Sequence, residues 1–330
     1  MGKLFAALLF PAALFLVDVA WADTPQKRIV GGSDASVSDV PWQTLVRISK
    51  QGSTYYCGGA IIADRWVATA AHCLDQDPIE KDGVVTPVSS SQVSLSSGFT
   101  YILDADSYTT PVKQVYIYGG YNDVSLMGDI ALIELSASTP AQTQNIQIAN
   151  TATQANLDAA LVAQTNHSML VSGWGKTDTN SSGSLYLQKA DVNGVADTSC
   201  YWAGNAASNQ IICAASIPTG TCKGDSGGPL VWVDPVYSGD ADGGRRLVGI
   251  VSFGSSNGCA TGTPDGYTEV ATFKDWIDGC ITGSCPAVSV ENPKASSSGS
   301  GGGSVNPITF FVLMLTLAMG RTRNALCCND

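Results

Sequence analysis

The chain has 330 residues, of which 44% are hydrophobic and 14% are charged, so it can bury a substantial core. Its formal net charge of -11 at pH 7 repels nucleic acids and anionic membrane surfaces, and we therefore expect no nucleic-acid partner. Its 35 glycines and low charge content favour an all-β protein with many turns over a helical one.

The first predicted element is a signal peptide over residues 1–22. Lys3 supplies the positive end, Leu4–Val17 is an apolar run too short for a comfortable membrane span, and Ala20-Trp21-Ala22 offers small residues for cleavage. An uncleaved N-terminal anchor is the alternative. Export implies an oxidising compartment, so the ten cysteines are disulfide candidates, and we expect no metal and no cofactor.

Residues 29–285 are predicted to form one folded unit of many short strands with a single helix at its end. In that helix Val270, Phe273, Trp276 and Ile277 fall on one face. The predicted strands are short β-branched stretches separated by turns, and examples are Trp42–Ile48, Trp66–Ala70, Val93–Leu95, Ile130–Leu135, Met169–Ser172, Ile211–Ala214, Leu230–Val233 and Leu247–Phe253.

The strongest chemical signal is the hexapeptide Gly224-Asp225-Ser226-Gly227-Gly228-Pro229. A serine hydroxyl becomes a good nucleophile when a base takes its proton, and flanking glycines let a substrate backbone approach. The amides of Gly224 and Ser226 can point at one spot, as an oxyanion hole requires. For the hexapeptide alone, a Gly/Ser turn without catalytic function is the alternative.

A base for Ser226 has to come from one of the two histidines in the chain. His72 stands in Thr69-Ala70-Ala71-His72-Cys73, whereas His167 lies in a polar, loop-like stretch, so His72 is the predicted base. Asp129 leads into an apolar strand, where its carboxylate needs a hydrogen-bond partner such as a histidine N–H. The rival acids, predicted to be solvated loop residues, are Asp104, Asp106 and Asp123.

Five motifs occur in the order that is typical of the trypsin/chymotrypsin family of serine proteases, which the chain resembles from Ile29 to about Ile281. They are Arg28-Ile29-Val30-Gly31-Gly32, the pentapeptide around His72, Asp129-Ile130-Ala131-Leu132, Gly173-Trp174-Gly175 and the hexapeptide around Ser226. The resemblance implies two six-stranded antiparallel β-barrels, about residues 29–140 and 141–285, followed by a C-terminal helix.

The resemblance also implies a secreted, monomeric serine endopeptidase that acts on protein or peptide substrates. Ser226 attacks the peptide carbonyl, His72 carries the proton and Asp129 orients His72. A substitution in this triad would have indicated a catalytically silent binding homologue, but all three residues are present.

By the same resemblance the protein is made as a zymogen. Residues 23–28 form an activation propeptide, and an activating protease, which could be another copy of the chain, cuts after Arg28. The freed amine of Ile29 then pairs with Asp225 inside the protein, and a buried ion pair of this kind can switch the oxyanion hole between formed and unformed.

The family pattern implies the disulfides Cys57–Cys73, Cys200–Cys213 and Cys222–Cys259. Cys280 and Cys285 are extra to that pattern, and we expect a local bridge at the end of the terminal helix. No Cys/His spacing predicts a zinc site, and no acidic pair predicts a calcium loop.

The predicted specificity pocket departs from the trypsin pattern. Gly220 stands where trypsin-like members carry an aspartate that selects Arg or Lys at P1, the substrate residue before the cut. Ser252-Phe253-Gly254 matches the strand that pairs with substrate backbone, and Asp265 takes a wall position facing Gly220, as in crustacean serine collagenases. We expect a mixed P1 preference for Arg, Lys and large apolar residues. The alternative places Asp265 outside a chymotrypsin-like apolar pocket.

The chain ends in a Gly/Ser-rich linker, residues 286–307, and an apolar tail, residues 308–330, that contains Arg321 and Arg323. This end resembles the glycine-glycine tails of Gram-negative surface proteases that a rhomboid-type protease trims. It therefore predicts a bacterial protein that is secreted or displayed at the cell surface, with transient or permanent membrane association through the tail. A GPI signal and a retained weak anchor are the alternatives.

Overall fold

The computed structural model describes residues 29–77, 83–176, 183–200, 209–215, 217, 219–254 and 258–285. The predicted signal peptide, the propeptide with Arg28, the linker and the apolar tail lie outside these ranges. Within them, no helix is both long and apolar enough to cross a bilayer.

The first sheet forms a nearly closed barrel of seven strands in the order β6-β5-β2-β3-β4-β8-β7. Its strands are β2 (Gln43–Lys50), β3 (Ser53–Ala63), β4 (Trp66–Thr69), β5 (Val93–Ser97), β6 (Thr109–Thr110), β7 (Val112–Ile117) and β8 (Ala131–Leu135). Leu45, Ile61, Leu95 and Leu132 are among the fully buried side chains that fill it.

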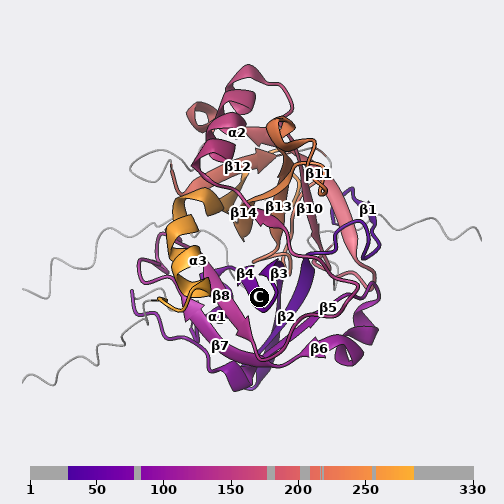
Figure 1. The fold of residues 1–330 in the computed structure, drawn as a ribbon, viewed down its shortest axis with the longest axis vertical. Helices are drawn as coiled ribbons and strands as arrows, with labels where there is room; N and C mark the ends of the chain where they lie inside the picture. The colour runs from indigo at the N-terminus through magenta and orange to yellow at the C-terminus, as the bar shows by residue number, and fades with distance from the viewer. Residues whose placement is uncertain are drawn as a thin grey trace, which may run out of the picture.

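The second sheet closes a six-stranded barrel, because β12 at one end of the order β11-β10-β13-β14-β15-β12 pairs back onto β11. Two short strands attach to it, β1 along β11 and β9 in parallel with β14. Its strands are β1 (Ser33–Asp34), β9 (Gln147–Ile148), β10 (Ser168–Gly173), β11 (Gln188–Val195), β12 (Ile211–Ala215), β13 (Pro229–Val233), β14 (Arg245–Phe253) and β15 (Asp265–Glu269). The prediction of an all-β fold with two barrels is confirmed, and Figure 1 shows the second barrel above the first.

Within the described ranges, three α-helices accompany the barrels: α1 (Ala71–Leu74), α2 (Thr151–Ala163) and α3 (Lys274–Ile281). The sequence analysis expected only the last, so α2 corrects it. The Asn150 side chain caps α2 by accepting a hydrogen bond from the Thr153 amide at 2.9 Å, while Leu157 and Leu161 reach the second core. The short 3-10 helices are η1 (Ser90–Gln92), η2 (Ile102–Tyr108), η3 (Asp197–Ser199), η5 (Pro235–Tyr237) and η6 (Val270–Phe273).

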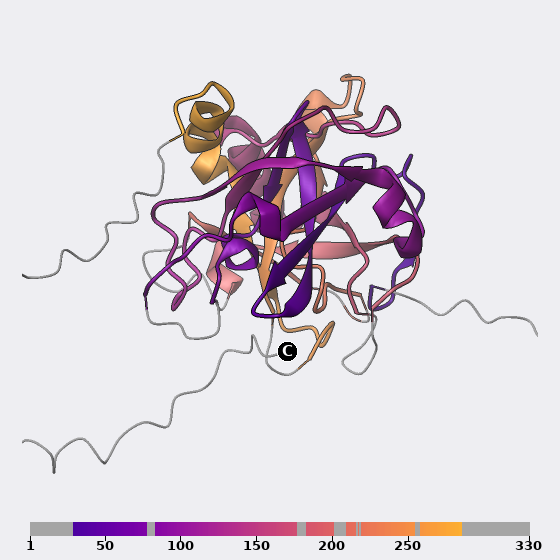
Figure 2. The ribbon, with the colours of Figure 1, turned by 90° about the horizontal axis from the view of Figure 1, so that it is seen from below.

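The terminal helix α3 continues η6 and packs along the side of the first barrel (Figures 1 and 2). Phe273 and Ile277 are buried in the first core, as the predicted apolar face requires, and Trp276 is partly buried. The Tyr118 ring lies 5.0 Å from the Phe273 ring and 5.4 Å from the Trp276 ring. Helix α3, at the end of the described residues, is thus packed against the first barrel.

Candidate active site

His72 and Asp129 meet at the end of the first barrel. His72 lies in α1, directly after β4, and Asp129 stands just before β8, the neighbour of β4. His72 Nδ1 lies 2.8 Å from Asp129 Oδ2, and the His72 backbone amide donates to Asp129 Oδ1 at 2.9 Å. The Asp129 side chain is fully buried, whereas the His72 side chain is 13% exposed. The carboxylate therefore holds both the imidazole, through Nδ1, and the backbone of His72, and it leaves Nε2 without a contact to Asp129.

Asp129 also receives contacts from the second barrel, which the sequence analysis missed. The Ser252 hydroxyl donates to Asp129 Oδ2, and the Thr268 hydroxyl donates to the Asp129 carbonyl at 2.8 Å. Ser252 was assigned to the substrate pocket, but the residue is only 3% exposed and its hydroxyl is directed to this carboxylate. A serine in the otherwise apolar stretch Leu247–Phe253 was the available signal. A buried carboxylate is stable only when such donors surround it.

Ser226 lies in the turn between β12 and β13, which packs directly against the histidine segment. The Ser226 carbonyl accepts a hydrogen bond from the Gly58 amide at 2.7 Å. A Cβ on Gly58 would lie 2.8 Å from Gly228 Cα, and a Cβ on Gly227 would lie 2.2 Å from Thr69 Oγ1. Glycines at these positions let the two barrels touch backbone to backbone, with Ser226 beside α1.

The turn before Ser226 leaves two amides available. Gly224 has φ +96°, in the region that favours glycine, and it lies close to Gly175. The Asp225 amide bonds the Cys222 carbonyl at 3.0 Å, and the Gly227 amide bonds the Val251 carbonyl at 2.8 Å. Among the described residues, the Gly224 and Ser226 amides donate to no backbone carbonyl. The same turn therefore presents a hydroxyl and free donors together.

Asp225 is a buried carboxylate without a charged partner among the described side chains. It accepts backbone hydrogen bonds from Gly175 at 2.9 Å and Cys222 at 3.1 Å. Burial, with a contribution from the nearby charge of Asp265, raises the pKa of Asp225 to about 7 against the effect of these two hydrogen bonds. A cationic partner would stabilise the charged form of a carboxyl buried in this way.

Residues 29–32 are already docked on the second barrel. Ile29 is fully buried in its core, and Gly32 closes a turn by donating to the Ile29 carbonyl at 2.6 Å. Val30 forms an antiparallel bridge with Gly220, whose amide bonds the Val30 carbonyl at 3.2 Å. The segment that follows the predicted cleavage site thus contacts a residue of the predicted specificity pocket.

Asp265 lies on β15 beside the pocket residues and is 7% exposed. Its Oδ2 accepts a hydrogen bond from Thr221 Oγ1 at 3.0 Å, and its Oδ1 lies 3.0 Å from the position of a Cβ on Gly254. Gly220 faces Ala260 instead, since a Cβ there would lie 3.3 Å from the Ala260 Cα and Cβ atoms. The Asp265 carboxyl group therefore lies next to Gly254 and Thr221, while Ala260 lies nearest to Gly220.

Of the other candidate acids, only the exposed pair behaves as expected. Asp104 is exposed, and Asp106 forms a surface ion pair with Arg47 at 2.5 Å. Asp123 was predicted to be solvated, but it is 1% exposed, so that prediction is wrong. Its loop packs inward, where the Gly83 amide donates to it at 3.3 Å. His167 is partly buried in the turn before β10, and its carbonyl accepts from Gly194 at 2.7 Å.

The three disulfides implied by the resemblance, Cys57–Cys73, Cys200–Cys213 and Cys222–Cys259, and the separately expected Cys280–Cys285 are all present in the structure. Cys57, His72 and Cys73 come close enough together to suggest a metal site. The two sulfur atoms are bonded to each other, however, and cannot act as thiolate ligands. The first bridge instead ties the Gly58 segment to the neighbour of His72.

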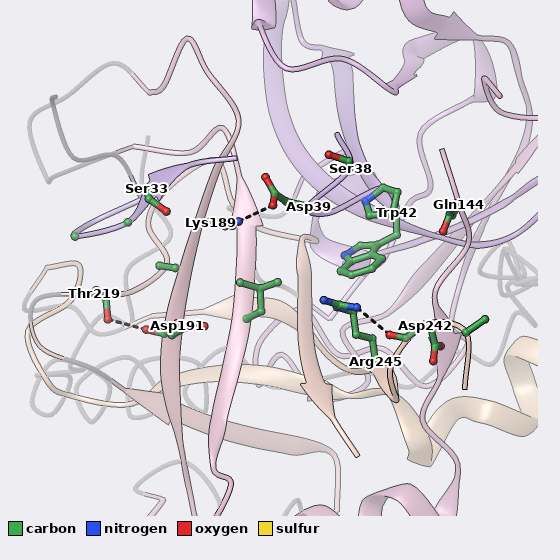
Figure 3. Close-up of a pocket in the computed structure, with 16 residues that line it drawn as sticks. Ser33, Ser38, Asp39, Trp42, Gln144, Lys189, Asp191, Thr219, Asp242 and Arg245 are labelled. Carbon is green, nitrogen blue, oxygen red and sulfur yellow. Dashed lines mark hydrogen bonds and ion pairs between the residues drawn. The ribbon is translucent and has the colours of Figure 1, made fainter. Parts of the chain in front are cut away.

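A separate surface pocket of about 610 Å³ lies elsewhere on the molecule (Figure 3). Trp42 lies on one side beside Arg245, and Lys189 pairs with Asp39 at 2.8 Å on the other. None of the 16 residues that line it is a predicted catalytic or specificity residue. The pocket therefore contributes nothing to the arrangement around His72.

Comparison with known proteins gives consistent matches over the folded unit. A family model described as Trypsin matches residues 29–277. Hypodermin-B of Hypoderma lineatum is 33% identical over 258 residues, which cover 76% of this chain and 86% of that protein. Trypsin beta of Drosophila erecta is 35% identical over 259 residues, covering 76% and 87%. Trypsin alpha of Drosophila melanogaster is 35% identical over 257 residues, covering 76% and 86%. These relatives are insect proteins and give no support to a bacterial source.

Proposed function

This chain belongs to the trypsin family and is therefore a serine endopeptidase, and we propose that Ser226, His72 and Asp129 are its catalytic residues. The observation that carries the proposal is the contact of 2.8 Å between His72 Nδ1 and the fully buried Asp129 carboxylate. This contact keeps the proton on Nδ1, so Nε2 is free to accept the proton of a serine hydroxyl.

The chemistry follows from these roles. Ser226 Oγ attacks the peptide carbonyl as His72 Nε2 takes its proton, and the Gly224 and Ser226 amides donate to the developing oxyanion. His72 then protonates the leaving amine, and water hydrolyses the acyl-enzyme by the same steps. In this structure the Ser226 hydroxyl has no hydrogen-bond partner among the described residues, and we expect its bond to His72 to form when substrate binds.

We also propose that cleavage after Arg28 activates the protein. The support is the buried Asp225, for which the described side chains offer no cationic partner, together with the fully buried Ile29 on the same barrel. An ammonium group at Ile29 would neutralise Asp225 and hold the turn that carries the Gly224 amide. Val30 also pairs with Gly220, so cleavage after Arg28 can affect the substrate pocket as well as the oxyanion hole. An uncleaved chain should therefore bind substrate poorly as well as turn it over slowly.

For specificity, we propose a mixed P1 preference in which Asp265 attracts Arg and Lys while large apolar residues are still accepted. The position of the Asp265 carboxylate against Gly254 and Thr221 favours this proposal. The Asp265 carboxylate already accepts a hydrogen bond from Thr221, so the preference for Arg and Lys over apolar P1 residues should be weaker than in a site built around a free carboxylate. The alternative remains an apolar P1 preference of the chymotrypsin type.

The test is to compare kcat/KM for matched peptide amides with Arg, Lys, Phe or Leu at P1, using enzyme activated by cleavage after Arg28. Asp265→Asn keeps the shape of the side chain and removes its charge, and we expect the Arg/Phe ratio to fall about 10- to 100-fold. The double change Gly220→Asp/Asp265→Gly should instead raise that ratio. An Arg/Phe ratio unchanged by both variants would mean that Asp265 lies outside the functional pocket.

The disulfides and the relatives are consistent with an extracellular protein, and we propose that residues 1–22 direct export and that residues 308–330 are processed afterwards. The intact mass of the exported protein tests both proposals. A glycine-glycine sorting tail predicts loss of the apolar residues, release by a phospholipase would favour a GPI anchor, and a mass that includes residues 308–330 would indicate a retained anchor.

A further inference from the structure

The turn between α2 and β10 carries a sequence for N-linked glycosylation that the protease activity does not use. Asn166-His167-Ser168 has the pattern Asn-X-Ser, in which X is not proline, and this pattern is the acceptor for glycans on surface loops of secreted proteins. The pattern recurs at Asn180-Ser181-Ser182, which lies outside the described residues.

Asn166 is exposed, and its side chain is held in one orientation. Its φ of +47° lies in the left-handed region, which asparagine tolerates better than most residues. Its Nδ2 donates to the Val233 carbonyl at 3.0 Å, and its backbone carbonyl accepts a hydrogen bond from Trp232 Nε1 at 2.7 Å. A side-chain amide carries two hydrogens, and the second has no acceptor among the described residues. A sugar can replace that hydrogen while the bond to Val233 is kept.

The serine of the acceptor sequence has no evident role in the fold. Ser168 is exposed at the start of β10, where its backbone pairs with Asn193. Its hydroxyl makes no hydrogen bond to the residues that the structure describes. The backbone conformation and the bond to Val233 explain an asparagine at position 166, but they do not require a hydroxyl at position 168. Glycosylation does require one.

Three exposed valines lie on the segments that meet at Asn166. Val162 is 73% exposed, Val233 is 42% exposed and Val236 is 68% exposed. Val233 is the residue whose carbonyl binds Asn166, Val162 lies near the end of α2, and Val236 lies on η5, shortly after Val233. Apolar side chains gathered on a surface favour aggregation, and a bulky, hydrophilic glycan covers such a surface.

We propose that Asn166 carries an N-linked glycan that shields these valines. In the reaction, Nδ2 forms a bond to the anomeric carbon of the first sugar of a lipid-linked oligosaccharide pyrophosphate. The bond from that carbon to the pyrophosphate oxygen breaks, the lipid pyrophosphate leaves with the electron pair, and one Nδ2 proton passes to a base of the transferase. The proposal goes beyond the protease activity and rests on the proposed export through residues 1–22.

The glycan lies away from the catalytic residues. Helix α2 is at the end of the second barrel that is remote from α1, the helix of His72 (Figure 1). Asn166 follows α2 shortly after its last residue. The expected effect of the glycan is therefore on aggregation, and kcat/KM of the activated enzyme should not depend on it.

The experiment expresses the full chain with Ser226→Ala in insect cells, because the relatives it matches are insect proteins. Asn180→Gln in every chain removes the other acceptor sequence. Peptides of the exported protein are mapped before and after treatment with peptide:N-glycosidase A, which converts a glycosylated asparagine into aspartate. We expect that conversion at position 166, and only after treatment. Ser168→Ala should abolish it without touching the bond from Asn166 to Val233, whereas Ser168→Thr should preserve it.

An unmodified Asn166 in the exported protein would overturn the proposal, and so would a glycan that persists in Ser168→Ala. A parallel chain, in which the signal peptide of a known secreted protein replaces residues 1–22, separates this result from the export proposal. If only the parallel chain is exported, residues 1–22 do not direct export, and the map of the parallel chain decides whether Asn166 is modified.

The shielding of the valines is tested on the same exported proteins. On warming, Ser168→Ala should aggregate several-fold faster than Ser168→Thr, and Val236→Ser added to Ser168→Ala should slow its aggregation. Equal aggregation of the two Ser168 variants would overturn the shielding role. In chains that keep Ser226 and have been activated, the same two variants should have equal kcat/KM.

Discussion

Asp225 should make the uncleaved chain lose stability as the pH rises from about 5 to about 8. Its carboxyl is fully enclosed, and burial raises its pKa from 3.8 to about 7 in the folded state. A group with a raised folded pKa binds its proton more tightly when folded. Its stabilising contribution is therefore complete below about pH 4 and is lost as the pH rises through about 7.

The size of the effect follows from the two pKa values. Between about pH 5 and pH 8 the linkage relation gives a loss of about 2.5 kcal/mol in the free energy of unfolding. For a domain of this size that loss corresponds to a fall of roughly 5–10 °C in Tm. Burial also raises the pKa of Glu269 to about 7, so Glu269 contributes in the same pH window. The contribution of Asp225 to the pH dependence of Tm is the fraction that Asp225→Asn abolishes.

The assay is Tm against pH for the Ser226→Ala chain, before and after cleavage following Arg28. Cleavage provides an ammonium at Ile29, which holds Asp225 in its charged form, so the cleaved chain should lose much less stability toward pH 8. Asp225→Asn should abolish the difference between the cleaved and uncleaved chains. Identical pH slopes in all of these proteins would refute the reasoning, because Asp225 would then have no raised pKa and no new partner.

Two further substitutions test contacts around the site. Ser252→Ala removes a donor to the buried Asp129 carboxylate, so kcat/KM should fall about 10-fold with KM nearly unchanged. A change in KM alone would mean that Ser252 acts in the substrate pocket and does not position Asp129. Gly227→Ala places a Cβ 2.2 Å from Thr69 Oγ1 at a φ of +78°, so the free energy of unfolding should fall by about 2–4 kcal/mol. Gly119→Ala is the control: its Cβ meets no atom within 4 Å, and the free energy of unfolding should change little. Equal effects of the two alanines would contradict the close approach at Gly227.

Strands that carry continuous β-branched residues could be predicted from the sequence, because that pattern is local and can be recognised without knowing what packs against the strand. The strands named from the sequence do not include β3, where Gly58 and Gly59 interrupt the pattern. Gly58 is required by its approach to Gly228, a contact between the two barrels that no local pattern encodes. Helix α2 was missed because its large apolar residues are few: Leu157 and Leu161 face the core, whereas Val162 is exposed, so no clear helical period appears.

The candidate site was predicted more fully than its surroundings. The motifs around His72, Asp129 and Ser226 are local, and the structure brings the first two into direct contact. The contact of Ser252 with Asp129 depends on how β14 of one barrel meets the other, which is a tertiary property. Asp123 was misjudged for a similar reason, since its polar neighbours suggested a solvated loop, whereas packing against residues 83–86 buries it.

Labelling with a fluorophosphonate, followed by peptide mapping, tests the proposed catalytic role of Ser226 most directly. A single adduct on Ser226 is predicted after cleavage following Arg28, with much slower labelling of the uncleaved chain and of His72→Ala. An adduct on another serine, or none in the cleaved protein, would contradict the triad proposed for this chain.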